Sequence, residues 1–449
     1  MKSKVISMIS ISTFSFPSSS IAISNKVLCR GCSILKAFGI ATLTVLILVS
    51  VAGASPFAYI ANLESNTVSV IDTATDTVTA TVNVGIEPSG AAVSLDGTRV
   101  YVTNCMSNSV SVIDAAKNKV IDTVYVGSYP WGVAVTPDGT KVYVANTASN
   151  TISVIDTATN NVTATVKVGN LPYKIAVSPD GKKVYAVNSG IPPDYQGNVS
   201  VIDTATNNVT ATVNVEKDPH GIAVSPDGAK VYVVNSNSYP YYKGTVSVID
   251  TTTNNVTATI NVESLPHGIA VSPNGTRAYV AVDIPGGYSG KGNIDATSHT
   301  GAVDVIDTTK NEVIARVSVG NYPYEVAVTP DGNEVCVVNS GSNTTSIIDT
   351  ATNNVNTTVP VGRSPTAVGI GPVIKSGSTI GLNGTSFLNS VNQTENQTND
   401  TGMTANAGTA GKEEKESVPT QASKDTPFLS PIWVLVALLG AVAFVRKMN

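Results

Sequence analysis

Short runs of apolar residues, broken by clusters of turn-forming residues, recur along most of the chain. The stretch from Pro130 to Val168 holds four such runs, all rich in valine, isoleucine and threonine, at residues 132–136, 142–145, 152–155 and 162–168. β-Branched residues in runs this short favour strands over helices. Pro137-Asp138-Gly139 lies between the first two runs and is typical of a tight hairpin turn. The pattern predicts a unit of four short antiparallel strands.

An Ile-Asp pair closes the third run of this unit and recurs along the chain. Its aspartates are Asp72, Asp114, Asp156, Asp203, Asp250, Asp307 and Asp349. The successive spacings are 42, 42, 47, 47, 57 and 42 residues, and a period of this size is typical of a repeat architecture. Four short strands cannot bury both faces of their sheet alone, so we expect the units to stack radially as blades of a β-propeller.

The phase of the repeat predicts how the ring closes. The repeated part of the chain begins with a second strand, near Tyr59, and ends after a lone first strand at residues 367–370. Three N-terminal strands and one C-terminal strand should therefore form one composite blade, which closes the ring and removes exposed sheet edges. We predict an all-β domain at residues 55–371, a seven-bladed β-propeller of four-stranded blades. Both of its ends should leave from the face that carries the Asp-Gly turns.

A Tyr-x-x-Asn motif marks the second strand of most units. Tyr101-Val-Thr-Asn104 is echoed by Tyr59-Ile-Ala-Asn62, Tyr143-Val-Ala-Asn146 and Tyr232-Val-Val-Asn235. With these motifs, residues 57–371 resemble the YVTN-repeat seven-bladed β-propellers of archaeal surface-layer proteins, of the methanogen type. Tyr279-Val-Ala-Val282 and Cys336-Val-Val-Asn339 depart from the motif. The resemblance implies a cell-surface location and a structural or adhesive role, and it implies no catalytic residue.

The N-terminal end of the chain differs from the repeats in composition. Residues 1–54 carry basic side chains, then an apolar run at 37–52, then the small residues Ala52-Gly53-Ala54. This order predicts a signal peptide that is removed on export. The alternative is an N-terminal membrane segment that stays attached.

The C-terminal end predicts a stalk and an anchor. Residues 372–430 are rich in serine, threonine, asparagine and glycine, which is typical of a disordered segment. Four asparagines there lie in N-glycosylation sequons: Asn383, Asn392, Asn396 and Asn399. Residues 431–449 hold most of an apolar run that ends before Arg446 and Lys447, which predicts a transmembrane anchor or a sorting signal replaced by a lipid. We therefore expect a glycosylated protein held at the extracellular face of a membrane.

Charge and cysteine content narrow the function further. Charged residues make up 13% of the chain, about half the share in ordinary soluble proteins, and the net charge is −5. The sequence has no basic patch for nucleic acid, so we expect no nucleic-acid partner. Cys105 and Cys336 fall in units that are not neighbours in the ring, so we expect no disulfide between them.

One face of the ring carries the extra residues. The longer units contain insertions between the second and third strands, at residues 189–197, 236–244 and 283–301. In a four-stranded meander these insertions share a face with the connections that lead to the next unit. That face is rich in tyrosine, and repeat proteins commonly place insertions on the face that binds. We expect this aromatic face to be the working face, the alternative being that its tyrosines only cover proline-rich loops.

The first strand of each unit enters the central channel at one equivalent position. The residues there are Ser89, Trp131, Tyr173, His220, His267, Tyr324 and Thr366, and Lys174 and Glu325 follow directly in two units. We expect the ligand-binding residues to be Trp131, Tyr173, Lys174, His220, His267, Tyr324 and Glu325. His220 and His267, with His299 from the longest insertion, also predict a divalent-metal site or an acid–base pair. Duplication of one blade is the alternative explanation of the two aligned histidines.

These features predict an exported surface protein that acts as a structural, adhesive or binding module. Its expected partners are cell-envelope components, other surface proteins or glycans, and the membrane through the C-terminal segment. No cofactor is expected apart from the divalent metal at the histidines. The alternative is a propeller enzyme, similar to lactonases or lyases, with a histidine-containing site at the channel mouth.

Overall fold

The computed structural model describes residues 56–192, 194–237, 243–285 and 299–371. The predicted leader (1–54), stalk (372–430) and anchor (431–449) lie outside these ranges, as do Asn383, Asn392, Asn396 and Asn399. Among the residues that are described, no helix is long and apolar enough to cross a membrane.

The described chain consists almost entirely of short strands that form seven four-stranded antiparallel sheets. The first sheets contain β1 (Phe57–Asn62), β2 (Thr67–Asp72), β3 (Thr77–Asn83), β4 (Pro88–Val93), β5 (Arg99–Asn104), β6 (Ser109–Asp114), β7 (Lys119–Tyr125), β8 (Pro130–Val135), β9 (Lys141–Asn146), β10 (Thr151–Asp156), β11 (Asn161–Lys167), β12 (Pro172–Val177), β13 (Lys183–Asn188), β14 (Gln196–Asp203) and β15 (Asn208–Lys217). The remaining strands are β16 (Pro219–Val224), β17 (Lys230–Asn235), β18 (Thr245–Asp250), β19 (Asn255–Asn261), β20 (Pro266–Val271), β21 (Arg277–Pro285), β22 (His299–Asp307), β23 (Glu312–Val319), β24 (Pro323–Val328), β25 (Glu334–Asn339), β26 (Thr344–Asp349), β27 (Asn354–Pro360) and β28 (Pro365–Gly371). A single 3-10 turn, η1 (Thr147–Ser149), joins β9 to β10 in the described part of the chain.

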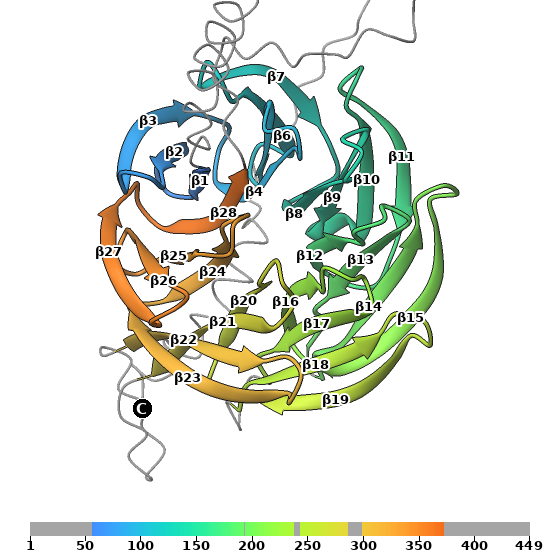
Figure 1. Cartoon of the computed structure of the whole chain (residues 1–449). Coiled ribbons are helices and arrows are strands. Elements are labelled where there is room, and N and C mark those ends of the chain that lie inside the picture. The colour runs from blue at the N-terminus through green and yellow to red at the C-terminus, as the bar shows by residue number, and fades with distance from the viewer. Residues whose placement is uncertain (1–55, 193, 238–242, 286–298, 372–449) are drawn as a thin grey trace, which may run out of the picture. The chain divides into compact units, whose positions relative to one another are not determined.

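The sheets are arranged as blades around a central channel, with the first strand of each blade innermost (Figure 1). Six blades are continuous in sequence, and the seventh has the strand order β28-β1-β2-β3. This composite blade confirms the predicted closure. Phe57 pairs with both Asp72 and Gly371, so both ends of the described ring lie on the face that carries the aspartate turns.

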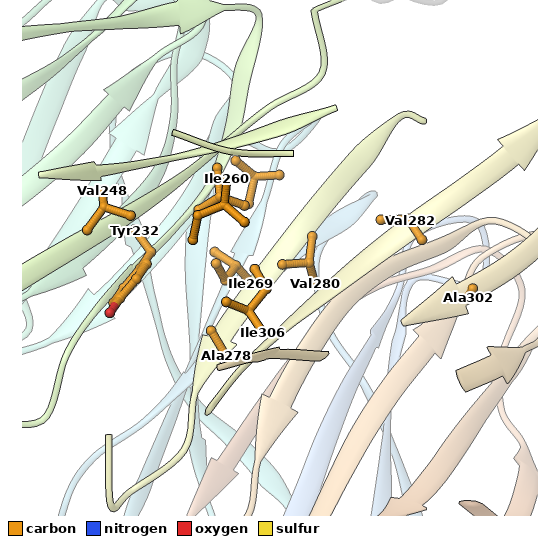
Figure 2. Close-up of a cluster of buried hydrophobic side chains, with 11 residues drawn as sticks. Tyr232, Val248, Ile260, Ile269, Ala278, Val280, Val282, Ala302 and Ile306 are labelled. Atoms are coloured by element: carbon orange, nitrogen blue, oxygen red, sulfur yellow. The ribbon is translucent and has the colours of Figure 1, made fainter. Parts of the chain in front are cut away.

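The hydrophobic core lies between the blades. Figure 2 shows one of its seven clusters, in which Tyr232 and Val248 of one blade pack near Ile269, Val280 and Ile306 of the next. Second and third strands are buried on both faces, whereas the outer fourth strands are largely exposed. Each buried valine or isoleucine contributes roughly 1.5–3 kcal/mol. Blades are therefore stable only when both neighbours are present.

The Tyr-x-x-Asn motif is explained by packing within and between blades. Tyr143 is fully buried, and the Asn146 side chain donates from Nδ2 to Thr151 Oγ1 at 3.1 Å and Ser153 Oγ at 2.9 Å. A Cβ atom at Gly127 would lie 2.6 Å from Asn146 Cγ, so the connection above the asparagine requires glycine. The motif thus locks the second strand to the third and to the preceding connection, which is a structural role.

The blade formed by β20–β23 replaces this arrangement with an ion pair. Val282 stands at the asparagine position, and Asp304 replaces the serine that accepts from this asparagine in other blades, such as Ser153. Asp304 is fully buried and accepts hydrogen bonds from Arg316 Nε at 2.7 Å and from the Glu263 backbone N–H at 3.0 Å. The departure of this blade from the motif is therefore a coordinated exchange of neutral for charged partners.

Part of the longest predicted insertion is strand. β21 continues to Pro285 and β22 begins at His299, with Asp283 opposite Gly301 and Pro285 opposite His299. The expectation of a loop over all of 283–301 is therefore wrong at its two ends. The β21–β22 ladder is longer than the corresponding ladders of the neighbouring blades. Cys105 and Cys336 are both buried free thiols, and they lie in blades that are not neighbours in the ring.

Candidate functional site

Five rings meet where the inner strands reach the channel. Each belongs to the second residue of β8, β12, β16, β20 or β24, so the shared register of these strands places the side chains at one level. The ring centroids are 5.0 Å apart for Trp131 and Tyr173, 5.2 Å for Tyr173 and His220, 5.5 Å for His220 and His267, and 5.1 Å for His267 and Tyr324. Trp131 and Tyr324, at 6.4 Å, complete the set. We call these five residues the aromatic cluster.

Of the seven positions predicted at the channel mouth, the remaining two hold polar residues whose side chains hydrogen-bond to the next blade. The Ser89 hydroxyl donates to the Pro130 carbonyl at 2.9 Å, and the Thr366 hydroxyl donates to the Pro88 carbonyl at 3.2 Å. Both side chains are buried. The structure therefore brings the whole predicted ring to one level, with the aromatic cluster on one side of the channel mouth and small hydroxyl residues on the other.

Two tyrosines extend the aromatic cluster outwards. Tyr129 stacks on Trp131 with centroids 5.9 Å apart, and Tyr322 lies 5.5 Å from His267. Both have positive φ angles, 57° and 54°. The equivalent residues of the other blades, such as Leu171 at 52°, share this conformation. The unusual backbone therefore belongs to the repeat and is not a local sign of function.

Two contacts cross the channel between β12 and β24. The Tyr173 and Tyr324 hydroxyls are hydrogen-bonded, and Lys174 Nζ forms an ion pair with Glu325 Oε2. The Lys174 and Glu325 side chains are only 14% and 15% exposed. Burial raises the pKa of both tyrosines, so both hydroxyls stay protonated at neutral pH. The channel mouth is thus bridged by side chains from opposite blades.

Removing the cross-channel ion pair should destabilise the ring. Lys174→Met leaves the Glu325 carboxylate largely buried without its cation, and we expect a loss of about 1–3 kcal/mol in the free energy of unfolding. Lys182→Met is the matched control, because the Lys182–Asp180 pair is separated by 3.7 Å with side chains 80% and 57% exposed. That change should cost less than about 0.5 kcal/mol. Equal effects in chemical denaturation would contradict a structural role for the cross-channel pair.

The two histidines of the aromatic cluster contact each other directly. His220 Nδ1 lies 3.4 Å from His267 Nδ1, and His220 Nε2 lies 3.2 Å from Asp218 Oδ1. Burial, and then the neighbouring charge of His220, lower the pKa of His267 to about 3, so this ring is neutral at physiological pH. A hydrogen bond between the two Nδ1 atoms requires one ring to donate and the other to accept. Where His267 is the donor, its Nε2 carries no proton and is an acceptor.

Two polar atoms of the cluster are buried without a hydrogen-bond partner among the described residues: His267 Nε2 and Trp131 Nε1. The indole N–H is a donor only, and His267 Nε2 is an acceptor where the ring carries its proton on Nδ1. Buried polar atoms normally have partners, and an orphan of this kind calls for an explanation. A hydroxyl group, which both donates and accepts, is the simplest group able to satisfy either atom.

The predicted metal trio is not assembled. His299 Nδ1 bonds to Asp283 Oδ2 at 2.7 Å, and the Tyr322 ring contacts both His299 and His267. In the described ranges, no group of three or more histidine, cysteine, aspartate or glutamate side chains could hold a metal ion. The expectation that His220, His267 and His299 converge is therefore corrected, because the extended β21–β22 hairpin pairs His299 with its own strand partner.

Sequence reasoning did not single out Asp283. It is fully buried, and it occupies the position at which Thr147, Ser189 and Ser236 donate to the first proline carbonyl of the next blade. Burial raises the pKa of the Asp283 carboxyl, which favours the protonated form. The aligned hydroxyl residues of neighbouring units were the signal that would have identified it.

The described residues also form open pockets away from the aromatic cluster. One of about 500 Å³ lies between the blades of β4–β7 and β8–β11 and is lined by Asp96, Arg99, Asp138 and Thr157, among others. Another, of about 220 Å³, lies beside β25 and is lined by Thr73, Asp331, Glu334 and Asp349, among others. Both belong to the face of the aspartate turns, so the sequence-based choice of residues did not include them.

Comparison with known proteins agrees with this architecture. Residues 98–191 match a protein family described as a YNCE-like beta-propeller. No match was found among curated proteins.

Several solved structures share the fold. Hydrazine synthase from Kuenenia stuttgartiensis is 25% identical, with a TM-score of 0.58 over 63% of this chain and 89% of that chain. A protein of unknown function from Desulfotomaculum acetoxidans is 15% identical, with a TM-score of 0.59 over 71% of this chain and all of that chain. A candidate 6-phosphogluconolactonase from Bacteroides uniformis is 18% identical, with a TM-score of 0.56 over 70% and 99%. The last two similarities concern the fold alone.

The family match, these structures and the sheet order define the class: the chain is a β-propeller. More particularly, it is a seven-bladed propeller of four-stranded blades that is closed by a composite blade.

Proposed function

We propose that this propeller is an exported, membrane-anchored cell-surface protein that binds glycans of the cell envelope through its aromatic face. The observation that carries the proposal is the aromatic cluster, with Trp131 Nε1 and His267 Nε2 buried but unpartnered within it. Sugars present hydroxyl groups that donate and accept, and their apolar ring faces pack on aromatic side chains. Sites of this kind combine an apolar lining with a few placed polar groups.

The ends of the chain support the surface location. The sequence of residues 1–54 is typical of an export leader, the sequons of residues 372–430 are typical of a glycosylated stalk, and residues 431–449 hold most of an apolar run that suits an anchor. Both ends of the described ring lie on the face of the aspartate turns. A stalk attached there would leave the aromatic face directed toward partners, which include other surface proteins as well as glycans.

Glycan binding can be tested with the intrinsic fluorescence of Trp131. The chain has two tryptophans, so Trp433→Phe leaves Trp131 as the reporter. We expect oligosaccharides released from a cell envelope to change this fluorescence, and His267→Ala to weaken binding at least tenfold, about 1.4 kcal/mol. Leu95→Ala, an exposed site near the turns of the other face, is the matched control and should bind as the unmodified chain does. Equal binding by the His267 variant would argue against this site.

The second candidate function is that of a lactonase-like or lyase-like enzyme. It is favoured by the contact between His220 and His267, because a neutral imidazole with an unpartnered nitrogen can act as a base. If the chain turns over a lactone or the bound oligosaccharide, and His267→Ala abolishes this turnover, an enzymatic function is favoured over binding alone.

A further inference from the structure

At each of four successive interfaces between blades, which we call seams, one cationic side chain binds the next blade. Each is the first residue of a second strand, and its head group donates to the carbonyl of a threonine in the next blade. The contacts are Lys141 to Thr204 at 2.6 Å, Lys183 to Thr251 at 2.9 Å, Lys230 to Thr308 at 3.4 Å, and Arg277 to Thr350. The threonine in each case directly follows the aspartate that ends the third strand. This contact is therefore a regular part of blade-to-blade packing.

One seam carries the opposite charge at this position. The aligned residues are Phe57, Arg99, Lys141, Lys183, Lys230, Arg277 and Glu334, and Glu334 is the one acid among them. Glu334 begins β25 in the last complete blade, β24–β27, and the aligned threonine of the composite blade is Thr73. We call the interface between these two blades the closing seam. A cation that would bind the Thr73 carbonyl is replaced there by a carboxyl group.

The charged groups that act on Glu334 are all carboxylates. Asp331 comes from the β24–β25 turn, Asp349 from the end of β26, and Asp76 from the β2–β3 turn of the composite blade. Glu334, Asp331 and Asp349 line the cavity of about 220 Å³ together with Thr73 and Pro56. An ionised Glu334 would face three like charges, whereas a protonated Glu334 can donate a hydrogen bond across the seam.

The closing seam also differs from the others in its core. Its core contains Cys336 where six other second strands carry a buried tyrosine. Ala58, Ile60 and Ile71 of the composite blade pack in the same cluster as Cys336. A thiol is much smaller than a phenol ring and makes fewer contacts across the seam. On the opposite face of the ring, the β1–β2 turn is held to the β27–β28 connection by hydrogen bonds and by the exposed Arg363–Glu64 ion pair.

We propose that the closing seam is a proton-controlled joint of the ring, which is tight when Glu334 carries a proton and loosens when Glu334 is ionised. Loosening moves β1–β3 away from β25 and exposes Cys336. The ring thereby acquires one joint at which it opens before the other blades separate, and this joint borders the blade in which the two ends of the ring pair.

The direction of the pH dependence follows from the same surroundings. Burial, and then Asp76, Asp331 and Asp349, raise the pKa of Glu334 from 4.5 to about 7. Between these pH values the folded chain holds a proton that the unfolded chain has released. Stability therefore falls as pH rises from 4.5 to about 7 and stays low above that, and the seam should be tight below this window and loose above it.

Thiol labelling of Cys336 tests the proposal at the seam itself. In the full chain with Cys29→Ser, Cys32→Ser and Cys105→Ser, Cys336 is the one thiol left. We would measure its rate of reaction with a disulfide reagent at pH 5 and pH 8, in that background and with Glu334→Gln or Glu334→Lys added. Glu334→Gln mimics the protonated acid, and Glu334→Lys restores the cation of the other four seams.

At pH 8 we expect Cys336 in the parent chain to react at least fivefold faster than in either Glu334 variant. At pH 5 we expect all three chains to react equally. Burial, and then the charges of Glu334 and Asp76, raise the pKa of the Cys336 thiol, so loss of the Glu334 charge would by itself speed the reaction of the variants. A slower reaction in the variants therefore reports a tighter seam. Glu312→Gln, which removes an exposed carboxylate from the start of β23, is the matched control and should follow the parent chain. Equal rates in the parent and both variants at pH 8 would overturn the proposal, as would the same ratio at both pH values.

Discussion

A chain that ends at Val361 is expected to lose cooperative unfolding, whereas a chain that ends at Gly371 should melt in a single transition. The ten missing residues include all of β28, the innermost strand of the composite blade. β28 pairs with β1 from Phe57 to Asn62, and its removal leaves the inner edge of β1 without a partner. The shorter chain should therefore aggregate or melt over a broad range of temperature.

The size of this effect follows from what β28 buries. Ala367 packs in the core shared with β5 and β6, and Val368 packs in the core of the closing seam with Cys336. Loss of this strand exposes two cores and a whole ladder of backbone hydrogen bonds. Such a loss approaches the net stability of a typical domain, about 5–15 kcal/mol. Differential scanning calorimetry of the two chains is the measurement, and identical transitions would contradict closure by the composite blade.

The fold could be predicted because the same physical signals occur seven times. Short runs of β-branched residues give the strands, Asp-Gly or Asn-Gly turns separate the first two strands in six units, and the phase of the repeat gives the composite blade. Equivalent register in each inner strand was also enough to place Trp131, Tyr173, His220, His267 and Tyr324 at one level. These positions depend on local spacing, which a sequence shows directly.

Contacts that depend on how far a side chain reaches could not be predicted in the same way. The register puts Lys174 and Glu325 at equivalent positions, but it does not say that they meet across the channel, because that depends on the channel's width. His299 was expected among the other histidines, and its partner is Asp283, two positions away on the paired strand. The sequence aligns Glu334 with the lysines and arginines of other blades. It does not show that those cations bind threonine carbonyls of the next blade, so the effect of an acid at this position could not be predicted.

The largest effect of a single substitution is expected at Arg316. Its guanidinium donates to both carboxylate oxygens of Asp304 and forms an ion pair with Glu263 at 2.6 Å. The Asp304 side chain is fully buried, whereas that of Arg316 is 43% exposed. Arg316→Thr would leave a buried carboxylate that keeps only one backbone donor. Breaking such a pair typically costs 3–5 kcal/mol, and exposure of the arginine reduces this to about 2–4 kcal/mol.

The neighbouring blades supply the control for this prediction. At the positions of Asp304 and Arg316 they carry serine and threonine, as in Ser247 and Thr259 of the β16–β19 blade. The double variant Asp304→Ser with Arg316→Thr removes the buried charge together with its partner, so we expect it to recover at least half of the stability that Arg316→Thr loses. Urea denaturation of the parent, both single variants and the double variant gives the coupling energy, which should exceed about 1 kcal/mol. A double variant as unstable as Arg316→Thr alone would show that the charge on Asp304 is not the cause, and that this blade depends on the arginine for its packing.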